Sequence, residues 1–351
     1  PLNHGTHGGL PLRGGGGFSA FPSGRELVSG RAVFSTFLRA VVIAGAAVLL
    51  ACAQEPVASV APALPEPRAV ESPLELQVEL HRRGFSCGSI DGVPGAQTEA
   101  ALRAFQRGAG LRDSGVLDQP TRAVLRIGVP ALEQHTISLE DLVGFEPMPT
   151  TWFGKAERAY LGHATLLERI AERFRANPKL LQRLNPEIDW DAVVAGTVVT
   201  VPAVEQALVL RPAAQLVIRL EARELEVVDV DGRVVAHFPV SIARKAEKRP
   251  VGDLRIMVVV RDPNYTFDPE LFSESAEAKE IGRRLLIPPG PNNPVGRAWI
   301  GLDWPGYGIH GTPDPEKIGR TESLGCFRLA NWDALTLLDL VRVGMTVVVE
   351  P

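Results

Sequence analysis

Hydrophobic and polar positions change their period along the chain, and each change marks a separate region. Between residues 73 and 127 apolar residues recur at helical spacing, as Leu76 and Leu80 do four positions apart. From residue 212 onward apolar residues follow each other in short runs such as residues 216–220, which predicts strands. We therefore expect a multidomain α+β protein in which small helical modules precede a β-rich C-terminal domain over residues 212–351.

The first module, residues 73–127, predicts three short helices. Gly84 ends the first helix, and Asp118 can cap the third, with Pro120 in its first turn. The segment resembles the three-helix peptidoglycan-binding domain family, which implies that it binds the cell wall; a spacer of the same fold is the alternative. The resemblance rests on Gly84-Phe85, the Ile-Asp-Gly turn at 90–92, Gly95, Thr98, Ala101-Leu102, Phe105-Gln106, Gly110-Leu111, Gly115, Leu117-Asp118 and Thr121.

A second module is predicted over residues 160–203. Two short helices with apolar faces are each stopped by an Asn-Pro pair, and residues 196–202 then alternate as a strand does. This order resembles a LysM-like α/β module, although the first strand of that fold is unclear. The resemblance implies a glycan ligand, and a degenerate copy kept as a linker is the alternative. Residues 128–159 fit neither module and stay an unassigned connector.

The N-terminal region is predicted to be a targeting signal rather than a folded domain. Arg39 precedes an apolar run over residues 40–51, which is too short to span a bilayer comfortably and has the length of a signal-peptide core. The run ends at Cys52 in a sequence that looks like a bacterial lipobox; cleavage after Ala53 is the alternative. We interpret residues 1–53 as a disordered extension with a signal peptide and lipobox, and residues 54–72 as a Pro/Ala-rich linker.

From these patterns we expect the protein to lie in the cell envelope, in the periplasm, where a lipid on Cys52 anchors it to the membrane. Formal net charge is −4 over 351 residues and no large basic block is present, which argues against nucleic acid as a partner. The three cysteines are Cys52, Cys87 and Cys326, so at least one has no partner within the chain. Cys87 reads as a small buried apolar residue.

Two short segments of the C-terminal domain carry candidate chemistry, residues 307–312 and 323–329. A thiol reacts as its thiolate, and an imidazole close to it can take the proton, so Cys326 and His310 form a candidate pair. Gly325 gives the backbone room to present the thiol. Asn331 is placed to cap a following helix over residues 332–341. A single His and a single Cys sixteen positions apart are nevertheless usually unrelated, and the surrounding residues must decide.

Those residues resemble the L,D-transpeptidase (YkuD-type) catalytic domain. The matching motifs are Ile-His-Gly-Thr at 309–312, the run Ser-x-Gly-Cys-x-Arg-Leu-x-Asn-x-Asp at 323–333, the turn at 249–256 and the loop at 292–296. The resemblance implies a β-sandwich with one helix after the catalytic loop, no metal and no organic cofactor. It also implies a substrate, a peptidoglycan tetrapeptide stem that is cut before its terminal D-alanine.

The resemblance assigns a role to each matching residue. Cys326 is the nucleophile and His310 the general base, oriented by the carbonyl of Gly311 or Thr312. The N–H groups of Gly325 and Cys326 form the oxyanion hole. Three further residues are expected to bind substrate: Arg328 a carboxylate, Ser323 as the motif hydroxyl, and Tyr307 as a cleft wall.

One residue departs from the family pattern. Leu324 stands where the family usually has a histidine before Gly-Cys, which puts rate and specificity in doubt more than the reaction class. The acyl group is expected to pass to an amine of another stem or of a protein lysine. Two alternatives stay open: an L,D-carboxypeptidase that uses water as acceptor, and a non-catalytic lipoprotein that binds peptidoglycan.

Overall fold

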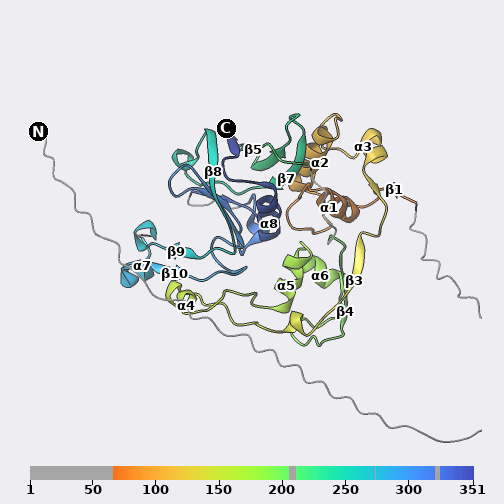
Figure 1. Cartoon of the computed structure of the whole chain (residues 1–351). Coiled ribbons are helices and arrows are strands. Elements are labelled where there is room, and N and C mark those ends of the chain that lie inside the picture. Colours follow the sequence, from red (N-terminus) through yellow and green to blue (C-terminus); the bar gives the residue numbers. More distant parts are fainter. Residues whose placement is uncertain (1–65, 205–210, 273, 321–324) are drawn as a thin grey trace, which may run out of the picture. The chain divides into compact units, whose positions relative to one another are not determined.

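The computed structural model describes residues 66–204, 211–272, 274–320 and 325–351, and these ranges belong to one compact unit (Figure 1). The predicted signal peptide, lipobox and Cys52 lie outside the described residues. Within the described ranges, no helix combines the length and the apolar character needed to cross a membrane.

The first module contains three helices, α1 (Pro73–Arg82), α2 (Ala96–Gly108) and α3 (Gln119–Val124). Asp118 caps α3 as predicted, because its side chain accepts a hydrogen bond from the Thr121 N–H at 3.0 Å. Two short strands, β1 (Arg68–Ala69) and β2 (Arg126–Ile127), pair antiparallel and join the ends of this module.

The second module has a strand–helix–helix–strand order. Helices α5 (Leu166–Arg173) and α6 (Pro178–Leu184) lie in the chain between β3 (Leu132–Thr136) and β4 (Val198–Pro202), which pair antiparallel. Strand β3 lies inside the segment that the sequence analysis left unassigned. Between β3 and α5 the chain forms a 3-10 turn at Glu140–Leu142 and the short helix α4 (Trp152–Ala156).

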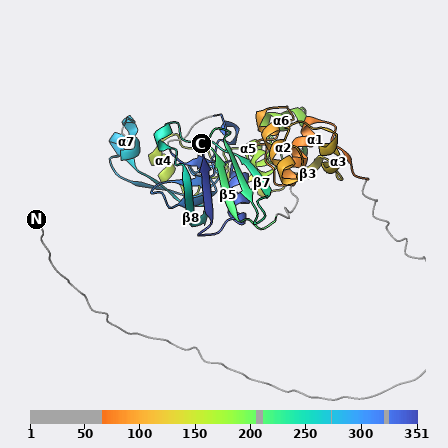
Figure 2. The ribbon, with the colours of Figure 1, turned by 90° about the horizontal axis from the view of Figure 1, so that it is seen from above.

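The C-terminal domain is built on one eight-stranded mixed sheet, in the order β13-β12-β11-β8-β14-β5-β6-β7. Figure 2 labels three strands of this sheet, β8, β5 and β7. The strands are β5 (Gln215–Arg219), β6 (Glu224–Val228), β7 (Val234–Pro239), β8 (Gly252–Arg261), β11 (Ala298–Leu302), β12 (Gly308–His310), β13 (Phe327–Arg328) and β14 (Thr346–Glu350).

This sheet curls until its two ends meet, which differs from the sandwich of separate sheets that we predicted. Ser241, just after β7, exchanges two backbone hydrogen bonds of 2.9 Å with Arg328 in β13. The long helix α8 (Asn331–Leu340) buries Ala334 and Leu337 in the apolar core of the sheet. The twist of neighbouring strands accumulates across a sheet and allows it to curl. A single curled sheet can therefore surround this apolar core.

A small subdomain is inserted between β8 and β11. It pairs β9 (Tyr265–Phe267) with β10 (Leu285–Ile287) and adds a 3-10 turn at Pro269–Phe272 and the helix α7 (Ala276–Ile281). Trp152 of α4 stacks on Phe267 with ring centroids 4.5 Å apart. The second module thus supplies part of the core of this insertion.

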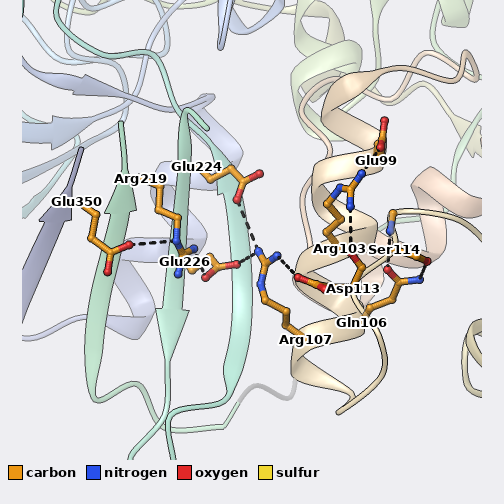
Figure 3. Close-up of polar contacts among 11 residues, drawn as sticks. Glu99, Arg103, Gln106, Arg107, Asp113, Ser114, Arg219, Glu224, Glu226 and Glu350 are labelled. Carbon is orange, nitrogen blue, oxygen red and sulfur yellow. Dashed lines mark hydrogen bonds and ion pairs between the residues drawn. The ribbon is translucent and has the colours of Figure 1, made fainter. Parts of the chain in front are cut away.

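The first module docks against the edge strand β7 of the sheet. The Ser86 N–H donates to the His237 carbonyl at 2.9 Å, and the His237 N–H donates to the Gly84 carbonyl at 3.0 Å. Helix α2 approaches so closely that a Cβ on Gly108 would collide with the Val234 carbonyl. Arg107, one residue earlier on α2, reaches Glu226 in β6 (Figure 3).

Candidate functional site

His310 ends β12, and Cys326 directly precedes β13, the neighbouring parallel strand of the curled sheet. In the β12–β13 pair Ile309 faces Phe327 and His310 faces Arg328. Cys326 directly precedes β13, so its position is opposite Gly308, two residues before His310. The register therefore brings the backbone at Cys326, just before β13, next to the strand that ends at His310.

The His310 imidazole is buried and held in one orientation. Its Nδ1 lies 2.6 Å from the Gly311 carbonyl oxygen, which can only accept, so Nδ1 donates and Nε2 keeps the lone pair. The ring lies nearly parallel to the Trp299 ring, with centroids 5.7 Å apart. Burial lowers the pKa of His310 to about 4, so the imidazole is neutral at pH 7. A neutral imidazole with an available Nε2 lone pair is suited to accept a proton.

The Cys326 thiol is protonated in the resting protein. Burial raises its pKa, while a hydrogen bond with the Gly308 backbone and the charge of Arg328 act in the opposite direction with less effect. The thiol also donates to the Gly306 carbonyl at 3.5 Å. Both members of the pair are thus neutral at pH 7, which favours proton transfer during attack over a preformed ion pair.

Two tyrosines lie close enough to Cys326 for its ionisation to affect their pKa values. Burial first, and then a negative charge on Cys326, raise the pKa of Tyr265 and of Tyr307. Tyr307 was predicted to form a wall of the cleft. Its ring lies next to Gly325, on the side where other residues carry their Cβ atom. Tyr265 was not predicted, because it stands in no motif and reaches the site only through the β9–β10 insertion.

Arg328 and Thr312 lie beside the pair. Arg328 is half-buried on β13, and burial lowers the pKa of its guanidinium. Thr312 is buried, and its hydroxyl accepts from the Asp314 N–H at 3.3 Å. The carbonyl that accepts from His310 belongs to Gly311 rather than to Thr312. Ser323 and Leu324 lie outside the described residues.

Asn331 has a different place from the one predicted. The residue that caps α8 is Ala330, which has no side chain to donate or accept. Asn331 is buried in the first turn, where its amide nitrogen donates to Glu172 at 2.9 Å and to the Pro291 carbonyl at 3.0 Å. Its oxygen accepts from the Arg297 N–H at 3.2 Å. The prediction of an N-cap was wrong, because these longer-range partners use the whole amide.

Other features of the described ranges lie away from this pair. A pocket of about 370 Å³ is lined by residues of both N-terminal modules and of the sheet, among them Gln97, Asn177 and Glu316. Neither Cys326 nor His310 lines it, so the chemistry and the pocket are at different places. Among the described residues, no group of three or more His, Cys, Asp or Glu side chains is arranged to hold a metal ion.

Two stretches of the chain match known protein families. Residues 213–349 match the family described as the L,D-transpeptidase catalytic domain, and residues 71–125 match a putative peptidoglycan binding domain. These ranges coincide closely with the β-rich domain and the first helical module.

Several known sequences and structures are similar to the chain. A putative L,D-transpeptidase YkuD of Bacillus licheniformis is 28% identical over 185 residues, which are 53% of this chain and 93% of the relative. A putative L,D-transpeptidase of Fuscovulum blasticum is 36% identical over 110 residues, 31% of this chain and 55% of the relative. A solved L,D-transpeptidase from Xylanimonas cellulosilytica covers 82% of this chain and 98% of its own, at 18% identity and a TM-score of 0.33.

Proposed function

We propose that this chain is a peptidoglycan L,D-transpeptidase that acts through Cys326. Its residues 213–349 match the L,D-transpeptidase catalytic domain, and its residues 71–125 match a putative peptidoglycan binding domain. The observation that supports this proposal is the β12–β13 register, in which His310 faces Arg328 while Cys326 directly precedes the facing strand. The relatives that are 36% and 28% identical are both described as putative L,D-transpeptidases.

The proposed reaction has two acyl-transfer steps. Cys326 Sγ attacks the carbonyl carbon between the L-centre of meso-diaminopimelate and D-alanine, while His310 Nε2 takes the thiol proton. The C–N bond then breaks, and D-alanine leaves with the proton that His310 held. An acceptor amine attacks the thioester and restores the thiol, giving a cross-link or a protein attachment. The N–H groups of Gly325 and Cys326 would stabilise the oxyanion.

Substrate recognition is expected to use the charged and aromatic groups beside the thiol. Arg328 would bind a stem carboxylate through its planar guanidinium, which matches a carboxylate in geometry. Tyr307 would form one wall, and Ser323 would act as the motif hydroxyl. The half-buried state of Arg328 supports this role, because a charge held partly out of water gains more from an anionic ligand than an exposed charge does.

The test is incubation with purified muropeptides that carry tetrapeptide stems, followed by mass analysis of the products. We expect wild-type protein to release D-alanine and to form a dimer, and Cys326→Ala to form neither while keeping its fold. Release of D-alanine with tripeptide products alone would identify the L,D-carboxypeptidase. No product at all, with wall binding intact, would identify the non-catalytic binder.

The second module supports a proposal of its own, that residues 132–202 form a LysM-like glycan-binding unit. The antiparallel β3–β4 pair around α5 and α6 supplies the strand order that the sequence resemblance lacked. Sedimentation of the whole protein with purified sacculi tests wall binding. Competition by chitin fragments that removes binding supports the glycan ligand, and unchanged sedimentation contradicts it.

The location is proposed from sequence alone. The apolar run that ends in Leu49-Leu50-Ala51-Cys52 supports an envelope protein held to the membrane by lipid on Cys52. Detergent partitioning of wild type and of Cys52→Ser is the measurement. A wild type that enters the detergent phase and a variant that does not support the anchor, while equal recovery of both in the aqueous phase supports simple secretion.

A further inference from the structure

The chain after His310 is described as far as residue 320, and this segment, residues 311–320, is held by side chains from both N-terminal modules. Glu316 lies in a 3-10 turn of that segment, Pro315–Lys317, and is half-buried. Its Oε1 accepts from the Ser89 hydroxyl of the first module at 3.0 Å. Its Oε2 accepts from the Asn177 amide of the second module at 2.6 Å. One carboxylate therefore joins three parts of the chain that are far apart in sequence.

A second contact holds the same segment two residues later. The Gln97 amide of α2 donates to the Ile318 carbonyl at 2.8 Å. The neighbouring Gly319 donates to the Ser241 hydroxyl at 2.9 Å, and its carbonyl accepts from Arg223 at 2.9 Å. Ser241 is also the residue that closes the sheet onto β13. The segment is thus fixed between the first module and the strand edge next to the catalytic register.

The two donors to Glu316 are themselves fixed. The Ile90 N–H donates to the Arg175 carbonyl, and the Asn177 N–H donates to the Ile90 carbonyl, both at 2.8 Å, so the modules are joined next to the carboxylate. Asn177 also caps α6, because its Oδ1 accepts from the Lys179 N–H at 2.9 Å. That cap sets the orientation of the amide and leaves the Nδ2 group facing Glu316.

We propose that Glu316 is a positioning residue through which both N-terminal modules set the reactivity of Cys326. The proposal rests on the proposed function in that Cys326 is taken as the nucleophile. Glu316 acts at a distance: it fixes the segment of residues 311–320, which directly follows the base His310. Loss of either donor lets the segment shift, and a displacement of even one ångström between reacting groups slows a reaction strongly.

An exchange of donor and acceptor tests this directly. In Asn177→Asp two carboxylates face each other, and we expect acylation of Cys326 by a carbapenem to slow by about tenfold or more, because like charges at this distance repel. In Glu316→Gln two amides face each other with one hydrogen bond lost, and we expect a loss of about fivefold. The double variant restores the pair with its roles reversed. The new amide at position 316 donates to the new carboxylate at position 177, and aspartate is also a good N-cap.

The double variant should therefore react within about twofold of wild type, because the hydrogen bond is restored. Gln97→Met, which removes the donor to Ile318 at constant volume, should slow acylation by about fivefold. Glu247→Gln, an exposed acid elsewhere in the same domain, is the matched control and should change nothing. Thermal midpoints of all variants are measured beside the rates, to separate reactivity from folding.

The rate of Cys326 alkylation by iodoacetamide is measured in parallel, because it requires no transpeptidase activity. Alkylation that follows the same order supports the positioning role even if the carbapenem does not react, an outcome that would count only against the proposed function. The positioning role is overturned if all variants react like wild type. It is also overturned if the double variant is as slow as its slower parent, which would show a general loss of structure.

Discussion

The Arg107 guanidinium of α2 contacts the buried Glu226 carboxylate of β6, and so joins the first module to the eight-stranded sheet (Figure 3). Arg219 contacts the other Glu226 oxygen at 2.5 Å and also reaches Glu350 at 3.2 Å. Burial acts to raise the pKa of Glu226, but the two arginine hydrogen bonds outweigh it and lower the pKa. A charge this deeply buried depends on its partners.

Arg107→Met should therefore destabilise the folded unit. Glu226 would keep Arg219 alone, and we expect a loss of about 2–3 kcal/mol, below the range for a buried charge left with no partner. The midpoint of urea unfolding is the measurement. In a Glu226→Gln background the same substitution should cost much less, because no buried charge is left behind.

Arg103→Met is the control for this prediction. Arg103 lies one turn earlier on α2 and pairs with Glu99 at the surface, where an ion pair contributes at most about 1 kcal/mol. If Arg103→Met and Arg107→Met lower the free energy of unfolding equally, the contact of Arg107 with Glu226 stabilises the protein no more than a surface ion pair does.

Removal of the proposed base should leave a folded protein with a slow thiol. We expect His310→Ala to reduce acylation of Cys326 by roughly a hundredfold or more, the usual contribution of a positioned general base. Stopped-flow measurement with a carbapenem gives the rate. Thr312→Ala serves as a neighbouring control, since the histidine is oriented by the Gly311 carbonyl. An unchanged rate in His310→Ala would remove the histidine from the mechanism.

The pH dependence of this rate should reflect the burial of His310. Its pKa is lowered to about 4, so the imidazole stays neutral and able to accept a proton well below the pH at which an exposed histidine is protonated. Acylation should hold its pH 7 rate down to about pH 5 and fall through about pH 4. An acidic limb centred near 6.5 would contradict the buried orientation. Circular dichroism at each pH separates this effect from unfolding.

Local patterns predicted much of the fold and of the site. The helical spacing at Leu76 and Leu80 and the cap at Asp118 depend on neighbours a few residues away, and the structure has both features. The candidate pair Cys326 and His310 could be named because each stands in a recognisable motif. That the strand ending at His310 pairs with the strand that follows Cys326 depends on parallel pairing, which a local sequence pattern does not predict.

Features that depend on distant partners were missed. Strand β3 exists as a strand through its pairing with β4, more than sixty residues later in the sequence. Tyr265 comes close to the thiol because it lies on an inserted hairpin. Asn331 does not cap α8, because its amide binds partners in the loop before β11 and in α5. Single-sequence periodicity carries no information on such contacts, because it describes faces of elements and not which faces meet.

The last prediction concerns Asp333, which is buried in the first turn of α8 and accepts from the Ser86 hydroxyl of the first module at 2.9 Å. Burial raises its pKa from the ordinary 3.8 to about 7. Between these two values the folded state holds a proton that the unfolded state has lost, so the stability gained from protonated Asp333 is complete below pH 3.8 and is lost as the pH rises through 7.

Asp333→Asn should remove this dependence while it keeps an acceptor for Ser86. The stability of the variant relative to wild type should therefore rise as the pH goes from 4.5 to 8, by an amount on the order of 4 kcal/mol at most. Buried histidines such as His81 and His237 have lowered pKa values and act in the opposite direction, but they are present in both proteins and cancel in the difference. Urea unfolding at several pH values gives that difference. Asp339→Asn, at an exposed acid on the same helix that pairs with Arg261, is measured beside it as the control variant. A constant difference for Asp333→Asn would mean that Asp333 is ionised in the folded protein, and that burial does not hold its proton.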